Sequence, residues 1–163
     1  MWIELPSLWI ALINIIGIPI AHLGLAWGAT RMPSSFFSPR TITPFPDWEI
    51  SLHHHLFLTR RWKHLLPDAA PWMGGVPKAH LASAEPDYLK QFITETRRGE
   101  FSHWAQLIVI LGFIAWNPWP ANLIIAIYAF ASNLPCILNL RYTRARLIRV
   151  LLKREPTLKT AHE

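Results

Sequence analysis

The longest apolar segment of the chain runs from Phe101 to Leu140 and contains no Lys, Arg, Asp or Glu over forty residues. As a single helix it would be roughly 60 Å long, about twice the hydrocarbon thickness of a bilayer. The motif Asn117-Pro-Trp-Pro120 interrupts it near the middle, and proline ends or bends a helix because it lacks an N–H donor. We therefore predict two membrane spans, about 102–119 and 121–140, folded back on each other at this motif.

A second uncharged run, Leu5 to Thr30, is also long enough to cross a bilayer. The residues before it include Glu4 but no Lys or Arg, and no small-residue cleavage site stands out. A signal peptide would have a basic start, so we interpret the run as a retained first span, about 5–29. Gly24 and Gly28 are four residues apart, a spacing that permits close helix packing.

The segment 31–101 is more polar and is predicted to lie on the cytoplasmic side. Prolines predict loops over 31–46 and 67–86. Between them, Asp47 is expected to cap a helix to about Leu66 with its apolar side chains on one face, which predicts an amphipathic helix on the membrane surface. A further helix should begin near Pro86 and continue into the second span, and a basic helix, 141–154, should follow the third.

The charge distribution supports this arrangement. Net charge is +6, with no Lys or Arg before the first span, nine from Arg31 to Arg98, and seven from Arg141 to Lys159. Cytoplasmic loops carry an excess of positive charge, so three spans would place the N-terminus outside and both basic regions in the cytoplasm. We accordingly predict a multi-pass protein of the cell membrane, in contact with membrane lipid, in which 1–163 form a single membrane domain.

Composition also narrows the class of protein. The chain is 52% hydrophobic and 16% charged, and soluble domains usually have about 25% charged residues. Six of the nine Trp residues lie near the ends of the apolar runs, as in aromatic belts, namely Trp2, Trp9, Trp27, Trp104, Trp116 and Trp119. The basic residues flank spans and form no known nucleic-acid-binding module, so no nucleic-acid partner is predicted.

The candidate chemistry lies where the chain meets the second span, in Glu95-Thr-Arg-Arg-Gly-Glu100-Phe-Ser-His103. At 100° per residue on a helix, Glu95 and Glu100 bracket His103 on one face. A carboxylate that orients a His is a common way to build a general base. The alternative is a solvated charged face preceding a span.

A metal site is the second alternative for these residues. Glu100-x-x-His103 has the spacing found in di-iron helix bundles, but those need two copies and the chain has one. The single Cys136 lies in an apolar run and is expected to be a packing residue. We therefore predict no metal site.

The third span ends in polar residues that could complete a site. Asn133 lies within the span, where an amide requires a partner. Arg141 and Arg144 follow one turn apart and could hold a phosphate or a carboxylate. The alternative for these arginines is ordinary anchoring at the cytoplasmic surface.

Several short motifs follow one another from about Arg60 to Lys153: Trp62-Lys63, Leu66-Pro67-Asp68, Gly74-Gly75, Glu95-Thr-Arg-Arg-Gly-Glu100, His103-Trp104, Asn117-Pro118, Asn133-Leu-Pro135, Arg141-Tyr142 and Arg144. In the order and spacing of these motifs, this part of the chain resembles the glycosyl-4,4'-diaponeurosporenoate acyltransferase family. The resemblance implies a small membrane enzyme that moves a fatty acyl chain onto a sugar hydroxyl of a glycosylated carotenoid.

Together these features predict an all-α integral membrane protein with acyltransferase activity toward a lipid-like acceptor. His103 would be the general base, oriented by Glu100 or Glu95. Substrate-binding residues would be Arg98, Asn133, Arg141, Tyr142 and Arg144, with Asn133 stabilising the oxyanion. No cofactor is expected beyond acyl-CoA or another activated acyl donor as co-substrate. The alternative is a non-enzymatic subunit of a larger membrane complex that binds pigment or lipid, and a homo- or hetero-oligomer is compatible with either.

Overall fold

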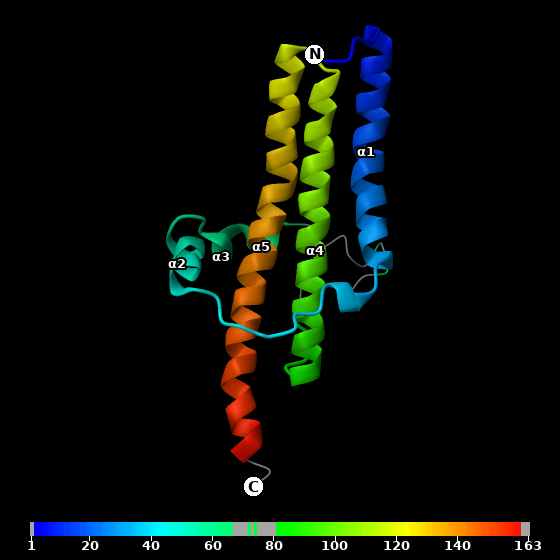
Figure 1. Cartoon of the computed structure of the whole chain (residues 1–163). Helices are drawn as coiled ribbons and strands as arrows, with labels where there is room; N and C mark the ends of the chain where they lie inside the picture. Colours follow the sequence, from blue (N-terminus) through cyan, green and yellow to red (C-terminus); the bar gives the residue numbers. More distant parts are fainter. Residues whose placement is uncertain (1, 67–71, 73, 75–80, 161–163) are drawn as a thin grey trace.

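Three long helices lie side by side and account for most of the structure (Figure 1). The computed structural model describes residues 2–66, 72, 74 and 81–160, with side chains described to Arg154. The helices are α1 (Ser7–Arg31), α4 (Pro86–Gly112) and α5 (Trp119–Thr160). Shorter helical segments connect them, namely η1 (Ser34–Phe36), α2 (Asp47–His55), α3 (Thr59–Trp62), η2 (Lys63–Leu65) and η4 (Phe113–Ala115). No strand occurs in the described ranges, which confirms the all-α prediction.

Helix α4 begins at Pro86, as predicted, and runs without a break into the second apolar segment. Proline is tolerated at the first helical position because the N–H there has no intrahelical partner. The charged residues that precede the predicted span therefore belong to the same helix as the span. After η4, the chain turns at Trp116–Pro118 and α5 begins at Trp119. Pro120 accordingly lies in the first turn of α5, where it costs no hydrogen bond.

Helix α5 joins two segments that the sequence analysis separated. The predicted third span, 121–140, and the predicted basic helix, 141–154, form one continuous helix of 42 residues. Its C-terminal part extends beyond the level at which α4 begins (Figure 1). One helix therefore carries both an apolar half and a basic half.

The prediction of one helix from Asp47 to Leu66 was wrong in extent. Helix α2 ends at His55, and Leu58 has a left-handed backbone (φ 48°) before α3 begins. Two side-chain contacts hold this break: His53 Nδ1 lies 3.0 Å from Thr59 Oγ1, and Trp62 Nε1 donates to the Phe57 carbonyl at 2.7 Å. Both contacts join residues only five or six positions apart, and they replace backbone bonds that a continuous helix would form.

Two apolar clusters fix the packing of α4 against α5. One lies near the turn (Leu107, Ile110, Phe113, Ile125 and Ala129) and the other in the charged half (Leu89, Phe92, Ile93, Leu147, Ile148 and Leu151). At the turn, the amides of Asn14 and Asn117 exchange hydrogen bonds of 2.7 and 3.1 Å, which fastens α1 to the hairpin. Asn117 is completely buried, so this pair replaces the water that its amide loses.

Two helices, Ser7–Arg31 and Trp119–Arg154, are long and apolar enough to cross a membrane. None of the most apolar window of α1 is buried within the chain, and large side chains such as Ile15, Ile20 and Leu23 are exposed. Helix α4 does not meet the same criterion, because its apolar part from Phe101 to Gly112 is short and follows four charged residues, Glu95, Arg97, Arg98 and Glu100. The three-span prediction is therefore supported for the first and third spans only.

The small-residue face at Gly24 and Gly28 is not used inside the chain. A Cβ atom added at either position would meet nothing within 4 Å. The close approach is instead at Gly17, where an added Cβ would lie 3.1 Å from the Phe113 ring. The close contact of α1 with the hairpin therefore lies at Gly17 and Phe113, nearer the turn than Gly24 and Gly28.

Candidate active site

The candidate residues lie where the apolar halves of α4 and α5 give way to their charged halves. Glu100 is the central group, and both of its carboxylate oxygens accept from arginines of α5. Oε1 lies 3.1 Å from Arg141 Nη1, and Oε2 lies 2.5 Å from Arg144 Nη2. The two arginines are one turn apart, so both can reach the same carboxylate. The hairpin therefore brings together residues 41 and 44 positions apart.

Arg141 extends this network to a third helix. Its Nε and Nη2 atoms donate to Glu49 Oε1 at 2.9 and 2.8 Å, and Glu49 belongs to α2. The arginine thereby fastens the connecting segment to the bundle. The sequence analysis did not select Glu49, although it is one of only ten acidic residues in a basic chain.

Arg144 is the most deeply buried cation of the network, at 8% exposure. The Phe45 ring lies 5.5 Å from its guanidinium carbon and 5.8 Å from that of Arg141. Its Nη1 atom is buried and has no hydrogen-bond partner among the described residues. A buried donor without a partner is costly, so a ligand's oxygen that accepted a hydrogen bond from this N–H would remove that cost.

Glu95 and Arg98 form a separate pair on α4, with Oε1 and Nη1 3.1 Å apart. Arg98 also donates to the Met32 carbonyl at 3.3 Å and stacks 5.5 Å from the centre of the Phe37 ring. These contacts join α4 to the segment after α1. Both predicted site residues therefore have structural partners in this conformation.

His103 lies one turn beyond Glu100 and contacts Asn133 of α5, with Nδ1 and Oδ1 3.1 Å apart. Asn133 is completely buried, and its Nδ2 donates to the Ala129 carbonyl and to Ser132 Oγ. Because both amide N–H groups are directed there, Oδ1 is the atom that faces His103. The orienting contact described for this ring thus comes from an amide of α5, while both oxygens of Glu100 accept from arginines.

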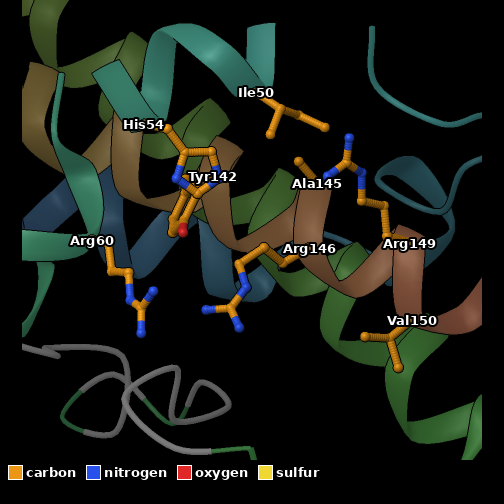
Figure 2. Close-up of a pocket in the computed structure, with 8 residues that line it drawn as sticks. All are labelled: Ile50, His54, Arg60, Tyr142, Ala145, Arg146, Arg149 and Val150. Atoms are coloured by element: carbon orange, nitrogen blue, oxygen red, sulfur yellow. The ribbon is translucent and has the colours of Figure 1, made fainter. Parts of the chain in front are cut away.

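Tyr142 is buried and faces away from this network, toward α2 and α3. It lines a cavity of about 260 Å³ together with Ile50, His54, Arg60, Ala145, Arg146, Arg149 and Val150 (Figure 2). His53, on the same side of the ring, has its pKa lowered by burial, an effect that the charge of Glu49 partly opposes. Burial, followed by the charges of Arg146 and Arg60, lowers the pKa of Lys63. Among the predicted substrate-binding residues, Tyr142 therefore lines this cavity, whereas Arg141 and Arg144 hold Glu100.

A second polar cluster lies inside the bundle around His22 of α1. The Nδ1 atom of this histidine lies 2.8 Å from Gln106 Oε1 and its Nε2 lies 3.1 Å from the Tyr128 hydroxyl, so it bridges all three long helices. In the part of the chain with described side chains, no three His, Cys, Asp or Glu groups converge as a metal site would require.

Comparison with known proteins identifies the family. A sequence profile described as glycosyl-4,4'-diaponeurosporenoate acyltransferase matches residues 33–153. The chain belongs to the glycosyl-4,4'-diaponeurosporenoate acyltransferase family. Curated members include the enzyme of this name from Staphylococcus aureus strain Newman, 33% identical over 150 residues that cover 86% of each chain. The protein from strain USA300 is 33% identical over 144 residues, covering 84% of this chain and 82% of that one.

The match to this acyltransferase family begins upstream of the motifs that carried the resemblance. It includes α2, and hence Glu49, in addition to the α4–α5 hairpin. Leu66-Pro67-Asp68 and Gly74-Gly75 lie wholly or partly outside the described residues, as does most of the predicted 67–86 loop. No solved structure matches the chain.

Proposed function

We propose that this protein is a multi-pass membrane acyltransferase that moves a fatty acyl group onto a hydroxyl of a glycosylated carotenoid or a similar lipid-like acceptor. The observation that carries this proposal is the family membership, which extends over most of the chain and includes the whole charged network. The exposed apolar face of α1 and the apolar half of α5 suit an acceptor that arrives from the lipid phase.

In the proposed mechanism, His103 removes the proton from the acceptor hydroxyl. The Asn133 carbonyl oxygen accepts from the Nδ1–H of the imidazole, which leaves the lone pair on Nε2 to act as the base. The hydroxyl oxygen then forms a bond to the acyl carbonyl carbon. When the tetrahedral intermediate collapses, the bond to the leaving group breaks and the proton on Nε2 passes to that group.

The arrangement changes the role that we assign to Asn133. An oxyanion donor needs an N–H directed at the substrate, and both N–H groups of this amide already donate within α5. Asn133 is therefore a positioning residue for His103. The unpartnered Nη1 of Arg144 is the better oxyanion donor, and Glu100 holds that guanidinium in place.

The proposed orientation places the N-terminus outside and both basic regions in the cytoplasm, in accordance with the positive-inside rule. The Glu100 network would then lie at the cytoplasmic interface, where an activated acyl donor such as acyl-CoA could reach it. Glu95 and Arg98 would brace α4 against the segment after α1. The Glu100 face is buried against α5 of the same chain and needs no partner subunit to cover it.

The direct test is lipid and pigment profiling of cells that produce the wild type or His103→Ala. The exposed His55 provides a matched control, His55→Ala. The proposal predicts loss of an acylated glycolipid or carotenoid product in the first variant only. An unchanged product pool in His103→Ala would overturn the role of His103, and absence of acyl transfer by the purified wild-type chain would favour the non-enzymatic subunit.

A further inference from the structure

The cavity between α2, α3 and the basic half of α5 carries a concentration of positive charge that the proposed reaction leaves unused (Figure 2). Arg60, Arg146 and Arg149 line it, and Lys63 lies beside it with its Nζ 5.9 Å from the centre of the Tyr142 ring. The Arg146 guanidinium lies at the same distance from that ring. Four cations from two separate parts of the chain thus gather around one buried tyrosine.

These cations are poorly compensated. Arg149 pairs with Asp47 at 2.9 Å, but that carboxylate is almost fully exposed. Arg60, Lys63 and Arg146 form no ion pair with a carboxylate among the described residues. Like charges close together repel one another, and an anion between them removes the repulsion. The lowered pKa of Lys63 has this crowding as one of its causes.

The surroundings of the cavity favour an amphiphilic ligand. Large apolar side chains are exposed on the segments that border the cavity, namely Trp48 on α2, Leu56 directly after α2 and Leu65 on η2. A ligand with an anionic head and an apolar chain could place the head among the cations and the chain along these surfaces. Arginine suits such a head because its planar fork matches phosphate oxygens.

We propose that the cavity bounded by Arg60, Lys63, Arg146 and Tyr142 binds the phosphate groups of an acyl-chain-bearing ligand. The same chemistry occurs in the head of an acyl-coenzyme A donor and in the head of an anionic phospholipid. The identification of the ligand as an acyl-coenzyme A donor rests on the proposed function, whereas the binding of phosphate groups does not. The site is distinct from the Glu100 network, because Arg141 and Arg144, which hold Glu100, do not line the cavity.

The test measures binding without chemistry, using the full-length protein in non-ionic detergent and coenzyme A as the probe. Arg60→Gln/Arg146→Gln is compared with Arg40→Gln/Arg61→Gln, which removes the same charge at exposed positions outside the cavity. We expect the first variant to bind coenzyme A about tenfold more weakly, because it loses two charge-assisted contacts to the phosphates, and the second to bind as the wild type does. Arg146→Lys keeps the charge and should retain most of the binding, which separates loss of the site from misfolding.

A second arm distinguishes the source of the phosphate. The same variants are assayed for association with nanodiscs of phosphatidylglycerol or phosphatidylcholine. If only the preference for phosphatidylglycerol depends on Arg60 and Arg146, the ligand is a phospholipid head. If neither coenzyme A binding nor lipid preference responds to these substitutions, the proposal is overturned. Cavity-dependent binding by a wild-type protein that transfers no acyl group would refute the proposed function and leave this site intact.

Discussion

Glu100 of α4 and Arg144 of α5 form an ion pair with both side chains about nine-tenths buried, and the remaining oxygen of the carboxylate accepts from Arg141. The pair joins the two arms of the hairpin at the level where charged residues begin. Since Arg141 also binds Glu49, one carboxylate organises three helices.

Glu100→Gln should destabilise the protein by about 3 kcal/mol, because removing one partner leaves a buried guanidinium without its counter-charge. Thermal unfolding in detergent, followed by circular dichroism, measures the change. The double variant Glu100→Met/Arg144→Met should be less destabilised than Glu100→Gln, since it leaves no buried Arg144 charge. Asp47→Asn, which breaks the exposed pair with Arg149, should cause little change. Equal losses for Glu100→Gln and Asp47→Asn would contradict the buried-pair interpretation.

Asn133→Ala should lower kcat by about 10²-fold with little effect on KM, because the His103 ring loses the acceptor that orients it. Asn133→Asp retains an oxygen acceptor and adds a negative charge beside the imidazole. It should recover part of the activity and move the acidic limb of the pH–rate profile to higher pH. A parallel loss for both variants, with no change in the pH profile, would assign Asn133 a purely structural role.

Stability should fall as the pH is lowered through about 6.5, the ordinary pKa of histidine. Burial lowers the pKa of His53 in the folded protein, so the unfolded chain takes up the proton first. The stability contributed by neutral His53 is then fully present above that pH and decreases below it, with a slope of up to about 1.4 kcal/mol per pH unit. Unfolding midpoints at pH 5 and pH 7.5 measure this effect.

His53→Gln should flatten that dependence, since glutamine does not titrate and can still reach Thr59. The exposed His55 on the same helix provides the control. If His55→Gln flattens the pH dependence as much as His53→Gln does, the burial of His53 is not its cause.

Gly17→Ala should leave the protein about 1 kcal/mol less stable than Gly24→Ala does. Both variants gain the helix propensity of alanine, but only the methyl group at position 17 would lie 3.1 Å from the Phe113 ring. Gly24→Ala is the matched control on the same helix and meets nothing within 4 Å. Denaturant titration of both variants gives the comparison. Phe113→Leu should lessen the effect of Gly17→Ala, and a larger loss at Gly24 would show that α1 packs elsewhere.

The sequence alone predicted the helical class, the start of α4 at Pro86, the hairpin at Asn117 and the segments that carry the site. These features depend on local chemistry, namely apolar runs, prolines and charge boundaries. The family resemblance likewise followed from motif order, since spacing along the chain is a property of sequence.

Only the tertiary structure decided which side chains meet. The sequence analysis assigned Glu100 or Glu95 to orient His103. It did not indicate that the arginines of α5 donate to both oxygens of Glu100 or that Asn133 contacts the ring. Local periodicity could not indicate the contacts of Glu49 and Phe45 with the arginines, or the cavity at Tyr142. Each of them joins residues far apart along the chain. The break at Leu58 differs from these, because the His53–Thr59 contact beside it joins residues only six positions apart, yet helical periodicity does not indicate it.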